Sequence, residues 1–301
     1  MKKLIATFKL ARPQQWVKNI FVFTAAIFAG QIFDPGAVSL TLSAFLGFCL
    51  ASSAVYFIND YKDVEEDKKH PTKCTRPLAA GLIPRQVGLF GFLVLFVAAV
   101  AVPYLFINRA TAFIVLIYLL LNIGYSFGLK HVVIIDVLVL SSGFVLRILA
   151  GATAISVLPS PWLVLCGVMI SLFLAFTKRR AEVVLLKERA SSHRRVLAQY
   201  SQAYLDQAIS IVTAATVVGY VLYTVDERTV ELVGSRAMIL GVPLVLYGIF
   251  RYLYLVYHAE TGGDPTKTVF TDIPLLITGA LWGILSMLII FFGKQIHGKF
   301  F

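Results

Sequence analysis

The sequence predicts an all-α integral membrane protein, and two observations lead to that fold class. The 301 residues are 58% hydrophobic and only 14% charged, whereas soluble domains are roughly 45 to 50% apolar. The apolar residues also form long runs rich in Leu, Ile, Val and Phe, which are typical of membrane-spanning helices. Because a bilayer offers the backbone no hydrogen-bond partners, such segments are helices rather than open strands.

Apolar windows of about 19 residues divide the chain into nine expected spans. We treat residues 1–301 as one transmembrane domain with two long polar loops, at about 59–84 and 178–204. Loops of this length in compact proteins are usually functional. The expected spans cover residues 16–33, 37–58, 85–107, 110–127, 133–156, 160–177, 205–225, 235–257 and 270–293.

The formal net charge of +11 lies mainly in alternate segments between the spans. By the positive-inside rule, these segments face the cytoplasm at a bacterial inner (plasma) membrane. The N-terminus and both long loops are then cytoplasmic, and nine spans put the C-terminus on the opposite side. Topology and attraction to anionic lipids account for most such charge outside the two long loops without any ligand, and we expect no nucleic-acid partner. The sequence leaves open whether the chain forms a homo-oligomer.

Oxygen-bearing side chains recur at helical spacing where the second span ends. Asn59, Asp63 and Asp67 are each four residues apart, a step of about 40° around a helix, so they share one face. Hard oxygen ligands of this kind suit Mg²⁺, which also binds substrate phosphate. The pattern predicts a Mg²⁺ site for a substrate diphosphate. The alternative is a solvated acidic helix end that pairs with nearby lysines such as Lys62.

The run from Asn59 to Asp67 resembles the Asn-Asp-x-x-Asp-x-x-x-Asp signature of the UbiA superfamily of intramembrane prenyltransferases. The spacing of nine helices is similar to that family over nearly the whole chain. The resemblance implies a helical bundle with a central cavity, capped by the two cytoplasmic loops, where Mg²⁺ binds a diphosphate.

Four further runs resemble one branch of that superfamily, the decaprenyl-phosphate phosphoribosyltransferases. They are residues 12–19, 125–131, 136–147 and 178–182. The resemblance implies transfer of 5-phosphoribose from phosphoribosyl diphosphate to a polyprenyl phosphate, with release of diphosphate. That reaction leads to lipid-linked arabinose for the cell envelope, and direct displacement predicts inversion.

The second long loop departs from the superfamily pattern. Most members carry a second aspartate-rich motif there, whereas residues 178–182 read Lys-Arg-Arg-Ala-Glu. Cations favour direct phosphate binding over a second metal. An alternative function, transfer of a polyprenyl group from its diphosphate to an aromatic acceptor, predicts the aspartates that this stretch lacks. A transporter or lipid-binding protein without catalysis predicts internal repeats or broken spans, and we find neither pattern in the sequence.

Other polar residues lie near the expected cytoplasmic face or inside spans. Arg12 and Asn19 either contact a substrate phosphate or anchor lipid headgroups, and Asp136 and Arg147 either bind substrate or form a structural network. Charged residues at 178–182 are also spaced to pair with one another on a helix. The candidate catalytic and metal-binding residues are Asn59, Asp63 and Asp67, and the candidate substrate-binding residues are Arg12, Lys18, Asn19, Asp60, Lys73, Arg76, Tyr125, Lys130, Asp136, Arg147, Lys178, Arg179 and Glu182.

Overall fold

The computed structural model describes residues 2–69, 73–188, 195–258, 268–269 and 271–300. Throughout these parts of the chain, every regular element is a helix, so the all-α prediction is confirmed. The chain divides into two compact units, and each is described by itself. The first comprises Met1–Val139 with Gly143–Leu158, and the second comprises Leu140–Ser142 with Pro159–Phe301.

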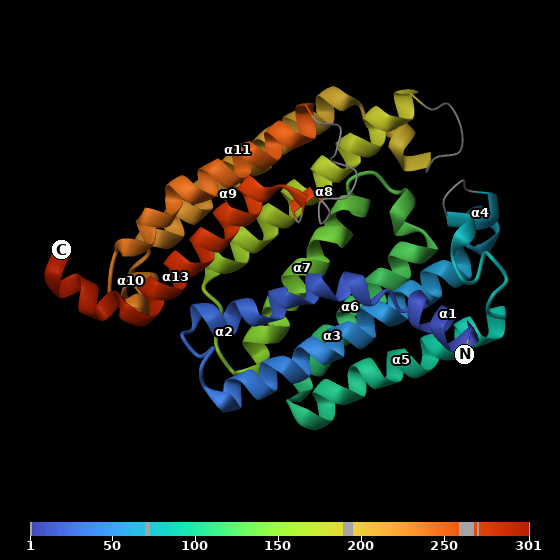
Figure 1. Ribbon diagram of the computed structural model, residues 1–301, viewed down its shortest axis with the longest axis horizontal. Helices are drawn as coiled ribbons and strands as arrows, with labels where there is room; N and C mark the ends of the chain where they lie inside the picture. Colours follow the sequence, from blue (N-terminus) through green and yellow to red (C-terminus); the bar gives the residue numbers. More distant parts are fainter. Residues whose placement is uncertain (1, 70–72, 189–194, 259–267, 270, 301) are drawn as a thin grey trace. The chain divides into compact units, whose positions relative to one another are not determined.

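The first unit is built around α3, which packs against α5, α6 and the 3₁₀ helix η1 (Figure 1). Its long helices match the predicted spans to within a few residues, except at the N-terminal end. The elements are α1 (Lys2–Leu10), η1 (Pro13–Phe23), α2 (Thr24–Phe28), α3 (Pro35–Lys62), α4 (Val64–Lys69), η2 (Lys73–Thr75), α5 (Arg85–Phe106), α6 (Arg109–Phe127), η3 (Leu129–His131) and α7 (Ile135–Ala154).

Two of these helices begin at residues that cap them. The Asp34 carboxylate accepts a hydrogen bond from the backbone N–H of Ala37 at 2.9 Å, and Pro35 occupies the first turn of α3. The side chain of Asn108 likewise accepts from the N–H of Thr111 at 2.8 Å, where α6 begins. Such caps satisfy backbone donors that have no partner within the helix.

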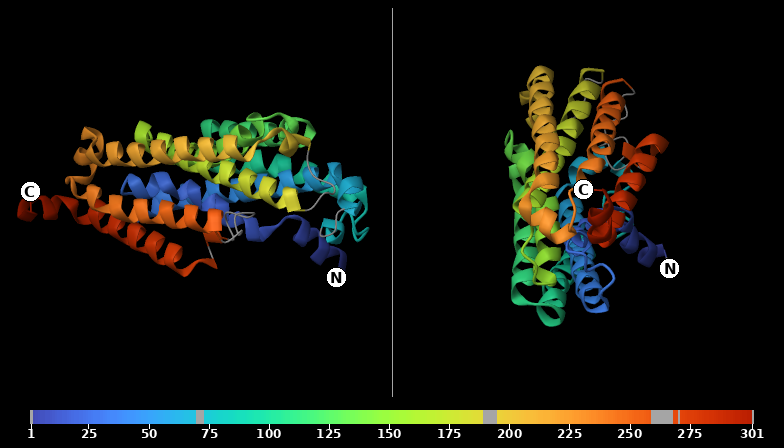
Figure 2. Two further views of the ribbon diagram at one scale, coloured as in Figure 1. Left: turned by 90° about the horizontal axis from the view of Figure 1, so that it is seen from above. Right: turned by 90° about the vertical axis from the view of Figure 1, so that its left-hand side faces the viewer.

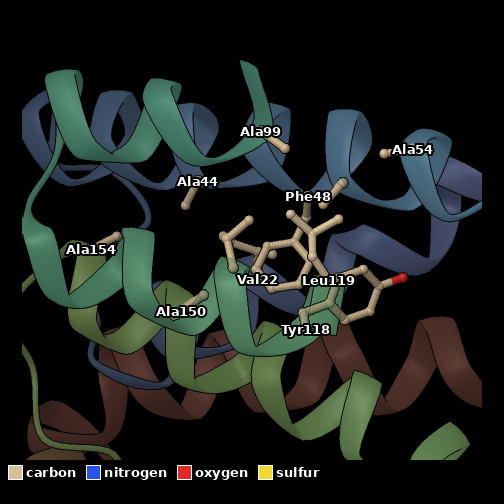
Figure 3. Close-up of a cluster of buried hydrophobic side chains, with 11 residues drawn as sticks. Val22, Ala44, Phe48, Ala54, Ala99, Tyr118, Leu119, Ala150 and Ala154 are labelled. Carbon is tan, nitrogen blue, oxygen red and sulfur yellow. The ribbon is translucent and has the colours of Figure 1, made fainter. Parts of the chain in front are cut away.

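The core of the first unit combines small residues with a few large ones. Phe48 of α3, Leu119 of α6 and Val22 of η1 are fully buried, and Figure 3 shows their side chains beside one another. Val115 and Tyr118 belong to the same cluster, and its remaining members are alanines, at Ala44, Ala51, Ala54, Ala99, Ala150 and Ala154. Small residues let neighbouring helices approach closely, which is how helices pack in membranes.

The structure of residues 16–33, where the first span is predicted, is not one continuous α-helix. Only Thr24–Phe28 is α-helical there, and the preceding Pro13–Phe23 is the 3₁₀ helix η1. Such helices seldom exceed 3 or 4 residues. Three residues per turn place Trp16, Asn19 and Val22 in one row, and tertiary contacts made by this row account for the unusual length.

Bonds to α3 fix this row of η1. The Trp16 indole N–H donates to Ser53 Oγ at 3.0 Å, and the Asn19 amide donates to Ser52 Oγ at 3.3 Å. Val22 packs so closely on α7 that a Cβ added to Gly151 would lie 1.9 Å from the Val22 carbonyl oxygen. Glycine is therefore required where η1 crosses α7.

Eight helices within the described chain are long and apolar enough to cross a membrane, so this is a multi-pass membrane protein. The segment from η1 through α2 adds an eleven-residue 3₁₀ helix and a five-residue α-helix. At about 2.0 and 1.5 Å per residue, it covers roughly 30 Å, the thickness of the hydrocarbon core. The segment is thus long enough to cross the membrane as the first of the nine predicted spans, in addition to the eight long helices.

In the second unit, α8 and α9 run side by side, as Figure 2 shows from two further directions. Helix α8 continues to Glu188, whereas the prediction ended the span at 177, because residues 178–188 are mostly strong helix formers. Residues 189–194 of the predicted loop lie outside the described residues. The elements are α8 (Pro161–Glu188), η4 (Arg195–Gln199), α9 (Gln202–Val225), α10 (Glu227–Val233), η5 (Ala237–Gly241), α11 (Val242–His258) and α13 (Ile273–Phe300).

Candidate functional site

The predicted row of oxygen ligands lies at the junction of α3 and α4. Helix α3 ends at Lys62, but the N–H of Asp63 donates to the Asn59 carbonyl at 2.9 Å and that of Asp67 to the Asp63 carbonyl at 2.8 Å. These bonds continue the four-residue turn through the junction, so the backbone retains the spacing on which the prediction depends.

Two members of the row face α6 and η3. Lys130 Nζ donates to Asp63 Oδ1 at 2.8 Å, and the lysine side chain is only 7% exposed. Ser126 Oγ donates its single hydrogen to the Asn122 carbonyl at 3.0 Å or shares it with Asn59 Oδ1, which lies 3.4 Å away in a long and weak contact. The sequence predicted Lys130 as a phosphate ligand, and here it forms a buried ion pair with Asp63.

The third member of the row, Asp67, shares a cation with Asp60. Arg76 Nη1 donates to Asp67 Oδ2 at 2.7 Å and to Asp60 Oδ1 at 3.1 Å. The same Asp60 oxygen accepts from Arg12 Nη2 at 2.6 Å. Asp60 and Asp67 are seven residues apart, which is close to two helical turns. The structure therefore groups Arg12, Asp60, Asp67 and Arg76, which the sequence had predicted only as separate ligands.

The buried carboxylates at this end of α3 are matched by cations. Asp60, Asp63 and Asp67 carry three negative charges, and Arg12, Arg76 and Lys130 supply three positive ones through ion pairs of 2.6 to 3.1 Å. Asp60 and Asp67 are nearly inaccessible, with side chains 2% and 4% exposed. Burial of this kind requires pairing, since an isolated buried carboxylate is very costly.

The donor set fits a hard divalent cation in its chemistry. Asn59, Asp63 and Asp67 offer one amide oxygen and two carboxylates, the ligands that Mg²⁺ takes together with water and phosphate. Among the residues described by the structure, no three His, Cys, Asp or Glu side chains converge as a metal-binding group. Asn59, Asp63 and Asp67 would hold such a metal with two carboxylates and an amide, and Lys130 and Arg76 already bond to the two carboxylates.

Asn19 and Arg147 lie deeper and form a different cluster. Arg147 Nε donates to Asn19 Oδ1 at 2.8 Å, Nη1 to the Gly143 carbonyl at 2.6 Å, and Nη2 to the Tyr118 hydroxyl at 3.2 Å. Asn19 is fully buried and Arg147 is 6% exposed. Both were predicted as substrate ligands. The structure places Arg147 in a structural network, which was its alternative, and it places Asn19 in the same buried network instead of among lipid headgroups. Tyr118 was missed, because an isolated tyrosine in an apolar span gives no signal.

The other predicted residues of the first unit are placed without a defined phosphate-binding geometry. Lys18, Lys73 and Tyr125 are half-buried, and Asp136 is fully buried in α7. Each of the four interacts with its surroundings within the structure. Their predicted role as substrate ligands remains a prediction.

The predicted cations of the second loop lie within helix α8 in the second unit. Arg179 is fully buried and donates to Glu182, one turn later, while Lys178 is half-buried. Arg180, which the sequence analysis did not single out, donates to Asp206 of α9 at 2.5 Å and lies 3.8 Å from the ring centre of Tyr257. The feature of the sequence that could have indicated this network is Asp206, a lone aspartate at the start of an apolar span.

Comparisons with known proteins agree with this architecture. The UbiA prenyltransferase family model matches residues 19–273. The chain is 36% identical over 281 residues to a decaprenyl-phosphate phosphoribosyltransferase of Corynebacterium glutamicum, covering 91% of this chain and 83% of that one. It is 33% identical to the protein of the same name in Mycolicibacterium smegmatis, covering 91% and 89%.

Solved structures show the same fold. A UbiA homolog from Archaeoglobus fulgidus, described as bound to GPP and Mg²⁺, superposes with a TM-score of 0.71 over 95% of this chain and 99% of that one, at 16% sequence identity. The family model and the curated relatives each span most of the chain. The chain therefore belongs to the UbiA prenyltransferase family.

Proposed function

We propose that this chain transfers 5-phosphoribose from phosphoribosyl diphosphate to a polyprenyl phosphate of the decaprenyl type, and releases diphosphate. The observation that carries the proposal is the similarity to decaprenyl-phosphate phosphoribosyltransferases, which extends over nine-tenths of the chain. Both substrates are phosphorylated, and the cations at the end of α3 suit that chemistry.

The two arginines and the lysine at this site bind the diphosphate of the donor. Arg12 and Arg76 are each about one-fifth exposed, so part of each guanidinium is accessible. Guanidinium groups bind phosphate oxygens through paired hydrogen bonds, and an ammonium group such as that of Lys130 adds a point charge. These side chains stabilise the charge that builds up on the leaving diphosphate.

The metal of the site is Mg²⁺, held by Asn59, Asp63 and Asp67. A UbiA homolog of the same fold is described as bound to GPP and Mg²⁺, and the oxygen donors of this chain suit that ion. When bound, Mg²⁺ neutralises a diphosphate and makes it a better leaving group. Lys130 and Arg76 lie next to the metal-binding carboxylates and so to the diphosphate.

The acceptor needs little activation by the protein. A phosphate monoester has a second pKa near 6 and is largely a dianion at neutral pH, so its oxygen can attack the anomeric carbon without a general base. This agrees with a site in which Asp, Asn, Arg and Lys are the polar groups. A single displacement of this kind inverts the anomeric configuration.

We place the reaction at the cytoplasmic face of a bacterial plasma membrane. The basic segments that contain Arg12, Arg76 and Lys130 lie on the side that the positive-inside rule assigns to the cytoplasm. Phosphoribosyl diphosphate is a soluble, highly charged molecule, and a cytoplasmic site gives it direct access. With η1 and α2 as the first of nine crossings, the C-terminus lies on the opposite face.

Turnover with defined substrates tests the proposal. Purified protein in lipid nanodiscs with Mg²⁺, phosphoribosyl diphosphate and decaprenyl phosphate should release diphosphate and form a phosphoribosylated lipid. The control reaction replaces the donor and acceptor with a polyprenyl diphosphate and 4-hydroxybenzoate. Product in the control alone would reject the proposal and assign the chain to the prenyltransferases with aromatic acceptors.

A further inference from the structure

Asp60 joins two arginines that lie far apart in the sequence. Its Oδ1 accepts from Arg12, 48 residues earlier, and from Arg76, 16 residues later, at 2.6 and 3.1 Å. The carboxylate is 2% exposed, whereas the two arginine side chains are 22% and 23% exposed. A buried anion thus fixes two cations that reach toward the surface of the unit.

Both guanidinium groups keep most of their donors for another partner. Arg12 uses only Nη2 in hydrogen bonds, and Arg76 uses only Nη1, within the described residues. A guanidinium has five N–H donors, so at least three on each arginine remain available. Part-exposed donors in fixed positions are suited to the oxygens of a phosphate group.

The backbone at Arg12 is also held in an unfavourable conformation. Its φ of 50° and ψ of 60° lie in the left-handed region, where a residue with a Cβ is strained. The guanidinium lies 4.6 Å from the ring centre of Tyr56 and bonds to Asp60. Strain of this kind persists where surrounding contacts fix it, and it is concentrated at functional sites.

Stability alone does not explain the buried carboxylate. Asp60 Oδ2 is buried and has no hydrogen-bond partner in the part of the chain that the structure describes. An unsatisfied carboxylate oxygen in a buried position opposes folding. Asp60 is therefore better explained by what it does to the two arginines.

We propose that Asp60 is a positioning residue, whose carboxylate holds Arg12 and Arg76 so that their remaining N–H groups bind the diphosphate of the donor. The inference rests on the proposed function and gives Asp60 a role separate from the metal-binding row of Asn59, Asp63 and Asp67. Asp60 acts through the arginines and does not contact the substrate.

Calorimetric titration with inorganic diphosphate in Mg²⁺ tests this role. The substitution Asp60→Asn keeps the side-chain shape but removes the charge, and should weaken diphosphate binding roughly 10- to 30-fold, as expected for the loss of charge-assisted hydrogen bonds. The matched control is Glu65→Gln, an exposed carboxylate of α4 that pairs with Lys68. The control should bind within about twofold of the unmodified protein, as is usual for an exposed ion pair.

A double-mutant cycle separates positioning from direct contact. With Arg12→Gln and Arg76→Gln already present, Asp60→Asn should cause no further loss of affinity, because the residues that it positions are gone. A further loss of the full 10- to 30-fold would show that Asp60 contacts the ligand itself, and would overturn the inference. The kinetic readout agrees if Asp60→Asn raises KM for the donor more than it lowers kcat.

A second set of variants keeps the test decisive if Asp60→Asn does not fold. Arg12→Gln and Arg76→Gln leave the buried carboxylate in place, and each should weaken binding. Since both arginines depend on one anchor, the double variant should lose less than the product of the two single losses. Independent, multiplicative losses would contradict a shared anchor.

These experiments distinguish failure of the role proposed for Asp60 from failure of the proposed function. Inorganic diphosphate is common to phosphoribosyl and prenyl diphosphate donors, so the titration does not depend on the donor. Turnover of a prenyl diphosphate alone would reject the proposed function and leave the role of Asp60 intact. Unchanged diphosphate affinity in a folded Asp60→Asn protein would reject the role of Asp60, whatever the donor.

Discussion

Helix α3 contacts two polar clusters that pair their cations in different ways. At its end, Arg12 and Arg76 pair with Asp60 and remain about one-fifth exposed. Ser52, roughly 12 Å back along the helix, belongs to the cluster in which Asn19 bonds to Arg147. The first cluster balances charge with charge, and the second surrounds one cation with neutral groups.

Arg147 shows how a membrane span can hold a cation without a carboxylate among its bonded partners. Its guanidinium donates to an amide, a carbonyl and a hydroxyl, and lies 4.9 to 5.5 Å from the ring centres of Phe48, Tyr118 and Phe144. Dipoles and aromatic faces partly replace the lost hydration. An arginine that is only 6% exposed stabilises the fold, whereas arginines that are about one-fifth exposed can bind a ligand.

The largest effect is expected from the carboxylates beside the metal. Asp63→Asn or Asp67→Asn should reduce diphosphate release about 100-fold or more, because each replaces a charged metal ligand with a neutral amide and removes the charge that pairs with Lys130 or Arg76. Initial rates over a range of Mg²⁺ concentrations measure the effect. In both variants the requirement for Mg²⁺ should shift to higher concentration.

Glu66→Gln is the control for these two changes, because Glu66 is an exposed neighbour on α4. Its rate and Mg²⁺ dependence should match those of the unmodified protein. Full activity in Asp63→Asn would contradict a metal site at the junction of α3 and α4, and would leave the ion pair with Lys130 as a purely structural contact.

A loss of stability is expected from the enclosed arginine. Arg147→Met leaves Asn19 Oδ1 without its guanidinium donor and removes the side-chain bond to the Gly143 carbonyl, and should lower the free energy of unfolding by about 2 to 4 kcal/mol. Thermal unfolding in detergent measures it. Diphosphate affinity of the folded variant should change less than about threefold, since the cluster stabilises helices rather than ligand.

The opposite result would mean that both clusters bind the substrate. If Arg147→Met unfolds like the unmodified protein but loses diphosphate affinity, Arg147 is a ligand of the substrate, as the sequence suggested. The comparison between an enclosed and an accessible arginine would then fail.

The smallest effect is expected from Ser126. Its 3.4 Å contact to Asn59 is weak, and its hydroxyl also bonds within α6. Ser126→Ala should change the rate of diphosphate release less than about threefold, because a weak neutral hydrogen bond contributes little. A loss of 10-fold or more, measured under the same conditions, would mean that Ser126 orients Asn59 as a metal ligand.

Local patterns predicted most of the fold and the helical spacing of the candidate metal ligands. Hydropathy located the spans, and the four-residue spacing of Asn59, Asp63 and Asp67 survives in the backbone bonds between them. These features depend on near neighbours in the sequence, so periodicity is enough to find them.

The partners of these residues could not be predicted, because they depend on tertiary structure. Nothing in the sequence indicates that Asp60 shares its oxygen with Arg12 and Arg76, or that Arg147 meets Asn19 across 128 residues. The 3₁₀ geometry of η1 was also missed, because apolar windows locate a span without distinguishing a 3₁₀ helix from an α-helix.

The pitch of η1 makes the length of the segment itself a functional constraint. Its residues advance about 2.0 Å each, so the seven steps from Arg12 to Asn19 cover about 14 Å, matching the 12 to 16 Å between their respective partners on α3. One residue inserted between these two positions would rotate the preceding chain by about 120° and shift it by about 2 Å. The first arginine of the chain would then miss its aspartate, although no charged side chain had been altered.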